Sequence, residues 1–191
     1  LEDNYVSSEY VITVDDKGYV SKLRLTFTKS KDRHLQEKEK LSEIVNEIVQ
    51  GCKETDEYGI VTYLHDEIIS RCSYDTKTDN MLNAYGCLVE GKAVCEGYAK
   101  AFIMLCDEFD IACLPVGGVT KDENGNDVLH MWNIVRIDGE WYHFDLTWDD
   151  PTTTVGGDFI SYDYFGLSDE EITKDHEITP LVYVTYPDAS N

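Results

Sequence analysis

The sequence lacks three things: an apolar run long enough to span a bilayer, a C-x-x-C pair, and an excess of basic residues. Its 16 Lys and Arg stand against 38 Asp and Glu, which gives a formal net charge of −22. Nucleic acid and anionic membranes would be repelled by this charge, so we expect neither nucleic-acid binding nor membrane insertion. The spacing of the 6 cysteines indicates mostly buried free thiols rather than a disulfide framework.

The composition is that of a globular protein, with a hydrophobic share of 42% over 191 residues. Leu1 to Tyr5 show neither an initiator Met nor a signal-peptide pattern, so we expect an excised or processed piece. Tyr5–Val14 and Tyr19–Thr28 alternate apolar and polar residues around a turn glycine, which predicts a hairpin. We divide the chain into two parts, 1–30 and one domain at 31–191. The first part is either an appendage of that domain or the end of a preceding domain.

Helical periodicity follows the hairpin. Apolar stripes predict helices over 32–50, closed by Gly51, and over 56–70. A third stripe begins at Cys95 and continues through Phe109, so Cys95 stands at a helix N-terminus. The unsatisfied N–H groups and the helix dipole there favour a thiolate, which is the nucleophilic form of cysteine.

The remaining segments predict an irregular stretch and then a sheet. Residues 73–92 lack a clear period, and long irregular segments within compact domains are often functional. Strands are expected at 112–120, 128–137 and 140–148, and Ser168 to Glu171 form a capping box that predicts a short helix.

Asp138-Gly139 is a strong signal for a two-residue hairpin turn, because both central residues of a type I′ turn need positive φ. In that register Trp132 opposes Asp145 and His130 opposes Thr147, and all four side chains point to one face. His130 and Asp145 then become diagonal neighbours within hydrogen-bond reach.

This placement supplies what a nucleophilic cysteine needs. An imidazole at His130 can accept the Cys95 proton and later protonate a leaving amine. The Asp145 carboxylate can fix the tautomer of that imidazole and stabilise its charged form.

Three blocks carry a resemblance to a known family: Gly91-Lys92-Ala93-Val94-Cys95-Glu96-Gly97-Tyr98-Ala99, then His130-Met131-Trp132-Asn133-Ile134-Val135, then Trp141 to Pro151. Their order of Cys, His and Asp resembles the transglutaminase-like superfamily, and more narrowly its bacterial members. The similarity runs from about residue 56 to 176. It implies an α+β, papain-like core in which a cysteine-bearing helix packs on an antiparallel sheet carrying His and Asp.

The resemblance also implies a Cys95, His130, Asp145 catalytic triad and an enzyme, either a hydrolase of the cysteine protease type or an acyltransferase. We favour hydrolysis of a peptide or carboxamide bond through a Cys95 thioester. The alternatives are a protein-glutamine transglutaminase with an amine acceptor and a non-catalytic cell-surface module that retains the fold. The expected partner is a protein or peptide substrate, with no cofactor and with the oligomeric state open. The usual location of such family members and the acidic composition suggest a secreted or cell-surface location, with the cytoplasm as the alternative.

Further residues are candidates for supporting roles. His143 shares the predicted face of His130, so we interpret it as a supporting residue of the site or, alternatively, as the base itself. Trp132 is expected to shape a cleft or cover the pair, whereas Trp148 is expected on the opposite face in the core. The backbone N–H of Cys95 is one oxyanion donor. Tyr74 and Tyr85 of the irregular segment are candidates for the second, ahead of Asn83. A metal site is not expected, because the spacing of Cys87 and Cys95 matches no common zinc pattern.

Overall fold

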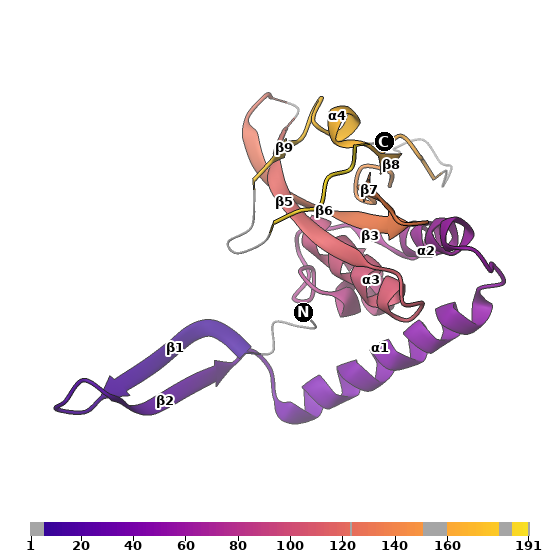
Figure 1. The fold of residues 1–191 in the computed structure, drawn as a ribbon. Helices are drawn as coiled ribbons and strands as arrows, with labels where there is room; N and C mark the ends of the chain where they lie inside the picture. Colours follow the sequence, from indigo (N-terminus) through magenta and orange to yellow (C-terminus); the bar gives the residue numbers. More distant parts are fainter. Residues whose placement is uncertain (1–5, 123, 151–159, 180–184, 191) are drawn as a thin grey trace.

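A computed structural model describes residues 6–122, 124–150, 160–179 and 185–190 of the chain (Figure 1). The α+β prediction is confirmed, because helices pack against an antiparallel sheet of five strands in the order β8-β7-β6-β5-β9. None of the described helices is long and apolar enough to cross a membrane. The strands are β1 (Val6–Val14), β2 (Val20–Phe27), β3 (Ser73–Tyr74), β4 (Lys92–Ala93), β5 (Cys113–Lys121), β6 (Asp127–Ile137), β7 (Glu140–Phe144), β8 (Phe165–Leu167) and β9 (Glu177–Ile178). The helices are α1 (Lys31–Gly51), α2 (Glu57–Arg71), α3 (Cys95–Asp107) and α4 (Asp169–Ile172), with a π-helical turn η1 (Gly86–Glu90).

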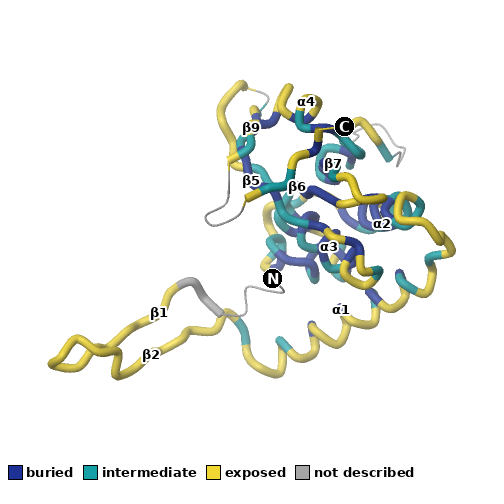
Figure 2. The backbone as a smooth tube through the Cα atoms, viewed as in Figure 1, coloured by how far each residue is buried: buried dark blue, intermediate teal, exposed yellow. Residues whose placement is uncertain are grey.

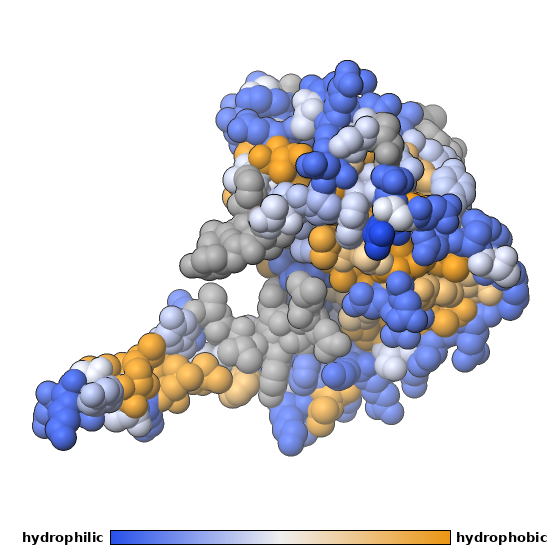
Figure 3. Space-filling model, in the orientation of Figure 1, coloured by the Kyte–Doolittle hydropathy of each residue, from blue (hydrophilic) through white to orange (hydrophobic). Residues whose placement is uncertain are grey.

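The N-terminal hairpin of β1 and β2 projects away from the rest of the molecule (Figure 1). Residues 9–27 of the hairpin are exposed along both strands (Figure 2), apolar ones included (Figure 3). The pairs Tyr10 with Leu25 and Ile12 with Leu23 place apolar side chains on a common face. The predicted hairpin is therefore formed, although Tyr5 lies outside the described residues.

The first two helices begin and end close to the predicted bounds, because each has a capping side chain immediately before its first turn. The Ser30 hydroxyl accepts a hydrogen bond from the Arg33 N–H at the start of α1. The Asp56 carboxylate accepts one from the Gly59 N–H at the start of α2. Their buried stripes join the main hydrophobic core.

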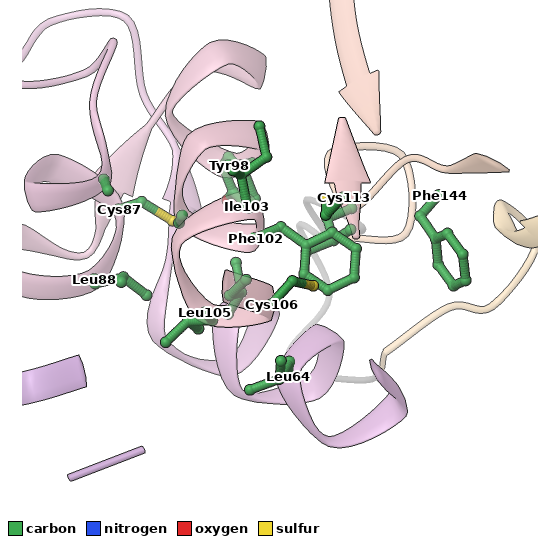
Figure 4. Packing of buried hydrophobic residues seen from close by; sticks show 14 of the residues in the cluster. Leu64, Cys87, Leu88, Tyr98, Phe102, Ile103, Leu105, Cys106, Cys113 and Phe144 are labelled. Carbon is green, nitrogen blue, oxygen red and sulfur yellow. The ribbon is translucent and has the colours of Figure 1, made fainter. Parts of the chain in front are cut away.

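Helix α3 lies at the centre of that core (Figure 4). It packs on α2 and on the adjacent strands β5 and β6. Tyr98, Phe102 and Leu105 are buried on it at the three-and-four spacing of a helical stripe. A smaller apolar cluster on the sheet contains Trp132 and Ile134 of β6 together with Ile172 of α4. Alternate residues of β6 thus belong to different clusters, as the period of two in a strand requires.

The predicted turn between β6 and β7 is present and sets the predicted register. Asp138 and Gly139 have φ of 51° and 94°, and Ile137 pairs with Glu140. The register continues as far as Asn133 opposite Phe144, where β7 ends.

The prediction that this strand continues to Trp148 is wrong. The Asp145 Oδ1 atom accepts hydrogen bonds from the Thr147 and Trp148 N–H groups, at 3.0 and 3.3 Å. The side chain thereby takes backbone donors away from the ladder and turns the chain. The expected pairings of Asp145 with Trp132 and of Thr147 with His130 are consequently absent from the ladder.

The segment predicted to be irregular contains two short strands and η1. β3 and β4 form a parallel pair in which Tyr74 lies opposite Ala93. The Val94 N–H donates to the Met81 carbonyl at 3.0 Å. The segment is therefore fastened to the residues immediately before α3. Strands β8 and β9, of three and two residues, were not predicted from the sequence.

Candidate active site

Cys95 is the first residue of α3, with Val94 as its N-cap. A valine side chain cannot accept a hydrogen bond from the first turn, so the helix start lacks a side-chain cap and is suited to an anion. The segment before the helix fixes this position closely: a Cβ added to Gly97 would come within 2.6 Å of the Met81 carbonyl oxygen. All six cysteines are free thiols, and only Cys95 and Cys52 are partly exposed while the other four are buried.

His130 of β6 lies between the cysteine and a carboxylate. Its Nε2 atom is 2.6 Å from Asp145 Oδ2, and the Cys95 thiol lies close enough to the ring to raise the pKa of His130. Because Nε2 is occupied by Asp145, Nδ1 is the ring nitrogen left for the thiol. The structure thus brings together Cys95, His130 and Asp145 from three segments far apart in the sequence.

The electrostatics of His130 favour its charged form. Burial by itself lowers the pKa of His130, but hydrogen bonds to Asp145 and Cys95 and their negative charges outweigh it and raise the pKa to about 10. An imidazolium beside Cys95 stabilises a thiolate, which is the arrangement that activates a cysteine nucleophile.

Asp145 is completely buried and accepts hydrogen bonds at both oxygens. Burial raises the pKa of this carboxyl, but the hydrogen bonds and charges of His130 and His176 outweigh it, so that its pKa lies below the usual range. The backbone donors at Oδ1 act in the same sense, because a carboxylate that accepts backbone N–H bonds is stabilised in its charged form.

His176, between α4 and β9, is the site residue that the sequence did not reveal. Its Nε2 atom lies 3.0 Å from Asp145 Oδ2, and its Nδ1 atom lies 2.6 Å from Asp175 Oδ1. The pairing with Asp145 joins residues 31 positions apart that occupy neither a common helix nor a predicted strand pair. No local pattern marks such a contact.

Three aromatic side chains surround the two imidazoles. Trp132 stacks on His130 with ring centroids 6.0 Å apart and is 1% exposed, so it covers the pair rather than lining an open cleft. Trp148 lies 4.5 Å from His176 and 6.0 Å from His130 between centroids. The expectation of Trp148 on the opposite face is therefore wrong, because the alternation of β7 stops at Phe144. Tyr164 also packs against His176.

His143 supports this aromatic cover. Its Nδ1 accepts a hydrogen bond from Trp132 Nε1 at 3.0 Å, and its Nε2 lies 2.8 Å from Asp169 Oδ1. Burial lowers the pKa of His143 despite the Asp169 carboxylate. Both ring nitrogens of His143 thus have partners other than Cys95, namely Trp132 and Asp169. This placement agrees with a supporting role and gives no support to His143 as the base.

The two tyrosines considered as oxyanion donors lie in different places. Burial first, and then the charges of Cys95 and Asp145, raise the pKa of Tyr74, so this residue lies next to the site. Tyr85 instead lines a cavity of about 170 Å³ with Glu37, Leu41 and other residues of α1. Its placement against α1 gives no support to Tyr85 as an oxyanion donor.

His130, Asp145 and His176 also form the group of three potential metal ligands found among the described residues, with ligand atoms within 4.8 Å of one another. Both imidazoles, however, lie at hydrogen-bond distance from the same oxygen of Asp145. Two ligands 2.0–2.1 Å from a tetrahedral zinc ion lie about 3.3 Å apart. The 2.6 Å contact is shorter, so these residues fit a hydrogen-bonded network better than an ion.

Residues 42–146 match the sequence profile of the Transglutaminase-like superfamily. A solved structure described as a TGase aligns with 15% identity and a TM-score of 0.47, covering 69% of this chain and 35% of that one. A chain from Cytophaga hutchinsonii, provisionally called a cysteine protease, aligns with 21% identity and a TM-score of 0.46, covering 63% of this chain and 43% of that one. This chain thus spans less than half the length of both solved chains. No curated protein matches the sequence.

Proposed function

The chain belongs to the transglutaminase-like superfamily, and from this premise we propose that it performs cysteine-dependent acyl transfer on peptide or carboxamide bonds, with water as the acceptor. The observation that carries the proposal is the contact of His130 with both Asp145 and the Cys95 thiol. Cys95 is the nucleophile, His130 the base and acid, and Asp145 the group that orients and charges the imidazole.

The reaction proceeds in two stages. The Cys95 thiolate attacks the carbonyl carbon, the C–N bond breaks, and the His130 imidazolium gives its proton to the departing amine, which leaves a thioester on Cys95. Neutral His130 then takes a proton from water, whose oxygen attacks the thioester. The carboxylic acid leaves and the thiolate–imidazolium pair is restored.

The oxyanion of each tetrahedral intermediate needs hydrogen-bond donors. The N–H of Cys95 is one, since the first N–H groups of an α-helix have no acceptor within the helix. Tyr74 is our candidate for the second, because it lies beside Cys95 and the residue is 44% exposed.

The first experiment measures the reactivity of Cys95. Iodoacetamide labelling at pH 7 is followed peptide by peptide by mass spectrometry, with Cys52 as an internal control because it is the other partly exposed thiol. We expect Cys95 to react about 10²-fold faster than Cys52 and to lose this advantage in His130→Ala. Equal rates for the two thiols would indicate a non-catalytic binding module.

The second experiment identifies the acyl acceptor. The protein is incubated with a peptide library in the presence and absence of primary amines, and both the Cys95 acyl adduct and the released products are measured by mass spectrometry. Hydrolysis predicts free carboxylic acids whose yield is unchanged by the amines. Products that carry the amine would instead assign a transglutaminase reaction. Cys95→Ser is the control that must abolish the adduct.

A further inference from the structure

The contacts of His176 set it apart from an ordinary core histidine. It is 2% exposed, and each of its ring nitrogens faces a carboxylate oxygen: Nε2 faces Asp145 Oδ2 and Nδ1 faces Asp175 Oδ1. A neutral imidazole carries only one N–H, so it can donate to one carboxylate but not to both. The His176 ring therefore links the Asp145 and Asp175 side chains.

His176 also completes the restraint on Asp145. Oδ1 of Asp145 is held by two backbone N–H groups, at Thr147 and Trp148, and Oδ2 is shared by His130 and His176. With both oxygens fixed, the carboxylate cannot rotate away from His130. The donor from His176 also offsets part of the cost of a buried negative charge.

We propose that His176 is a positioning residue of the reaction, which acts through Asp145 to hold that carboxylate ionised and aimed at His130. The proposal rests on the proposed function, because it assigns His176 to the same acyl-transfer site. It extends the chain of hydrogen bonds from Cys95, His130 and Asp145 through His176 to Asp175.

The charged and titratable groups around His176 come from several elements. Asp145 and Asp175 face its two nitrogens, His130 lies 5.6 Å away between ring centroids, and the Tyr164 hydroxyl donates to Asp175 Oδ2 at 2.7 Å. His143 lies farther away, but the electrostatic interaction with His176 contributes to lowering the pKa of His143. Loss of the His176 donor removes one of the hydrogen bonds that keep the pKa of Asp145 low. The Asp145 carboxylate, which stabilises the His130 imidazolium, would then be ionised only at higher pH. The pair of Cys95 thiolate and His130 imidazolium should therefore also form only at higher pH.

Two substitutions separate this role from simple packing. His176→Gln places an amide nitrogen near the position of Nε2 and so keeps a donor for Asp145, whereas His176→Asn reaches only the position of Nδ1 and loses that donor. The rate of Cys95 alkylation by iodoacetamide is measured from pH 4 to pH 9 in each. We expect the midpoint of its rise to move upward by about one pH unit in His176→Asn, as for the loss of one charge-assisted hydrogen bond, and to stay within about 0.3 of wild type in His176→Gln.

Asp175→Asn is the second variant, because the Asp175 side chain is 43% exposed and its replacement should leave the fold intact. Asp175→Asn removes the negative charge that faces His176 Nδ1. The midpoint of the rise in Cys95 alkylation rate should therefore move to higher pH, by less than in His176→Asn. A midpoint unchanged in His176→Asn overturns the role of His176. If that variant does not fold, an unchanged midpoint in Asp175→Asn overturns it instead. Wild-type Cys95 that alkylates no faster than Cys52 contradicts the proposed function, which is a separate outcome.

Discussion

Replacing Asp145 with Asn removes the charge opposite His130 while keeping the size of the side chain. In the wild type, burial lowers the pKa of His130, but Asp145 and Cys95 raise it from 6.5 to about 10. A shift of that size corresponds to about 5 kcal/mol in favour of the imidazolium. Without the carboxylate, burial is opposed by Cys95 alone, so the pKa of His130 should fall toward its ordinary value.

The expected consequence is a large loss of cysteine reactivity at neutral pH. His130 becomes mostly neutral in Asp145→Asn, so the Cys95 thiolate loses its stabilising partner. We expect alkylation of Cys95 at pH 7 to slow by about 10²–10⁴-fold.

The stabilising effect of the Asp145–His130 pair should decrease as pH rises. The pKa of His130 rises on folding, so its contribution to the free energy of unfolding is full below pH 6.5 and is lost as pH rises to about 10. The stability difference between wild type and Asp145→Asn, measured by urea unfolding, should therefore narrow over this range by up to about 5 kcal/mol.

Asp149→Asn is the matched control. Asp149 is also completely buried and also contacts a histidine, with Oδ2 at 3.2 Å from His65 Nε2, but it lies outside the contacts of His130. This variant should lose stability and keep the wild-type pH profile of Cys95 alkylation. A wild-type profile in Asp145→Asn as well would refute the reasoning about the pair.

Three further outcomes are expected. His143→Ala should keep Cys95 alkylation within about 10-fold of wild type, in contrast to a loss of about 10²-fold or more in His130→Ala, and equal losses would contradict the separate roles of the two histidines. Gly118→Ala should lower the free energy of unfolding by about 1–3 kcal/mol in urea, because the new Cβ would overlap the backbone oxygen of Glu177, whereas wild-type stability would mean that β9 can move away. Ser168→Ala removes the capping box of α4 and should lower the free energy of unfolding by about 1 kcal/mol, measured by thermal unfolding. The control Ser161→Ala loses only a local hydrogen bond from the Asp163 N–H and should lower it by less than about 0.5 kcal/mol.

Prediction from the sequence succeeded where the cause is local. The turn at Asp138-Gly139 fixes the β6–β7 register because positive φ at both residues is demanded by one turn type. It failed at the end of β7, where the Asp145 side chain captures the N–H groups that a longer strand would use. The placement of Trp148 was wrong for that same reason.

Contacts between distant segments account for the other omissions. His176 and His143 contact carboxylates in distant parts of the sequence, Asp145 and Asp169 respectively. Nothing in the spacing of these residues distinguishes such pairs from ordinary strand and loop residues. Tyr74 and Tyr85 looked equivalent in the sequence, yet β3 carries one to the site and the other packs on α1 just before η1.

By itself, the sequence determined the mixed fold, the cysteine at a helix N-terminus and the turn that aims His130, because periodicity, capping and turn chemistry act over a few residues. Tertiary structure alone decided that Asp145 contacts two histidines, that Trp148 packs against both of them, and that the ring nitrogens of His143 have partners other than the thiol. These arrangements depend on burial and on hydrogen bonds between distant segments. Such contacts form only when the whole domain has packed.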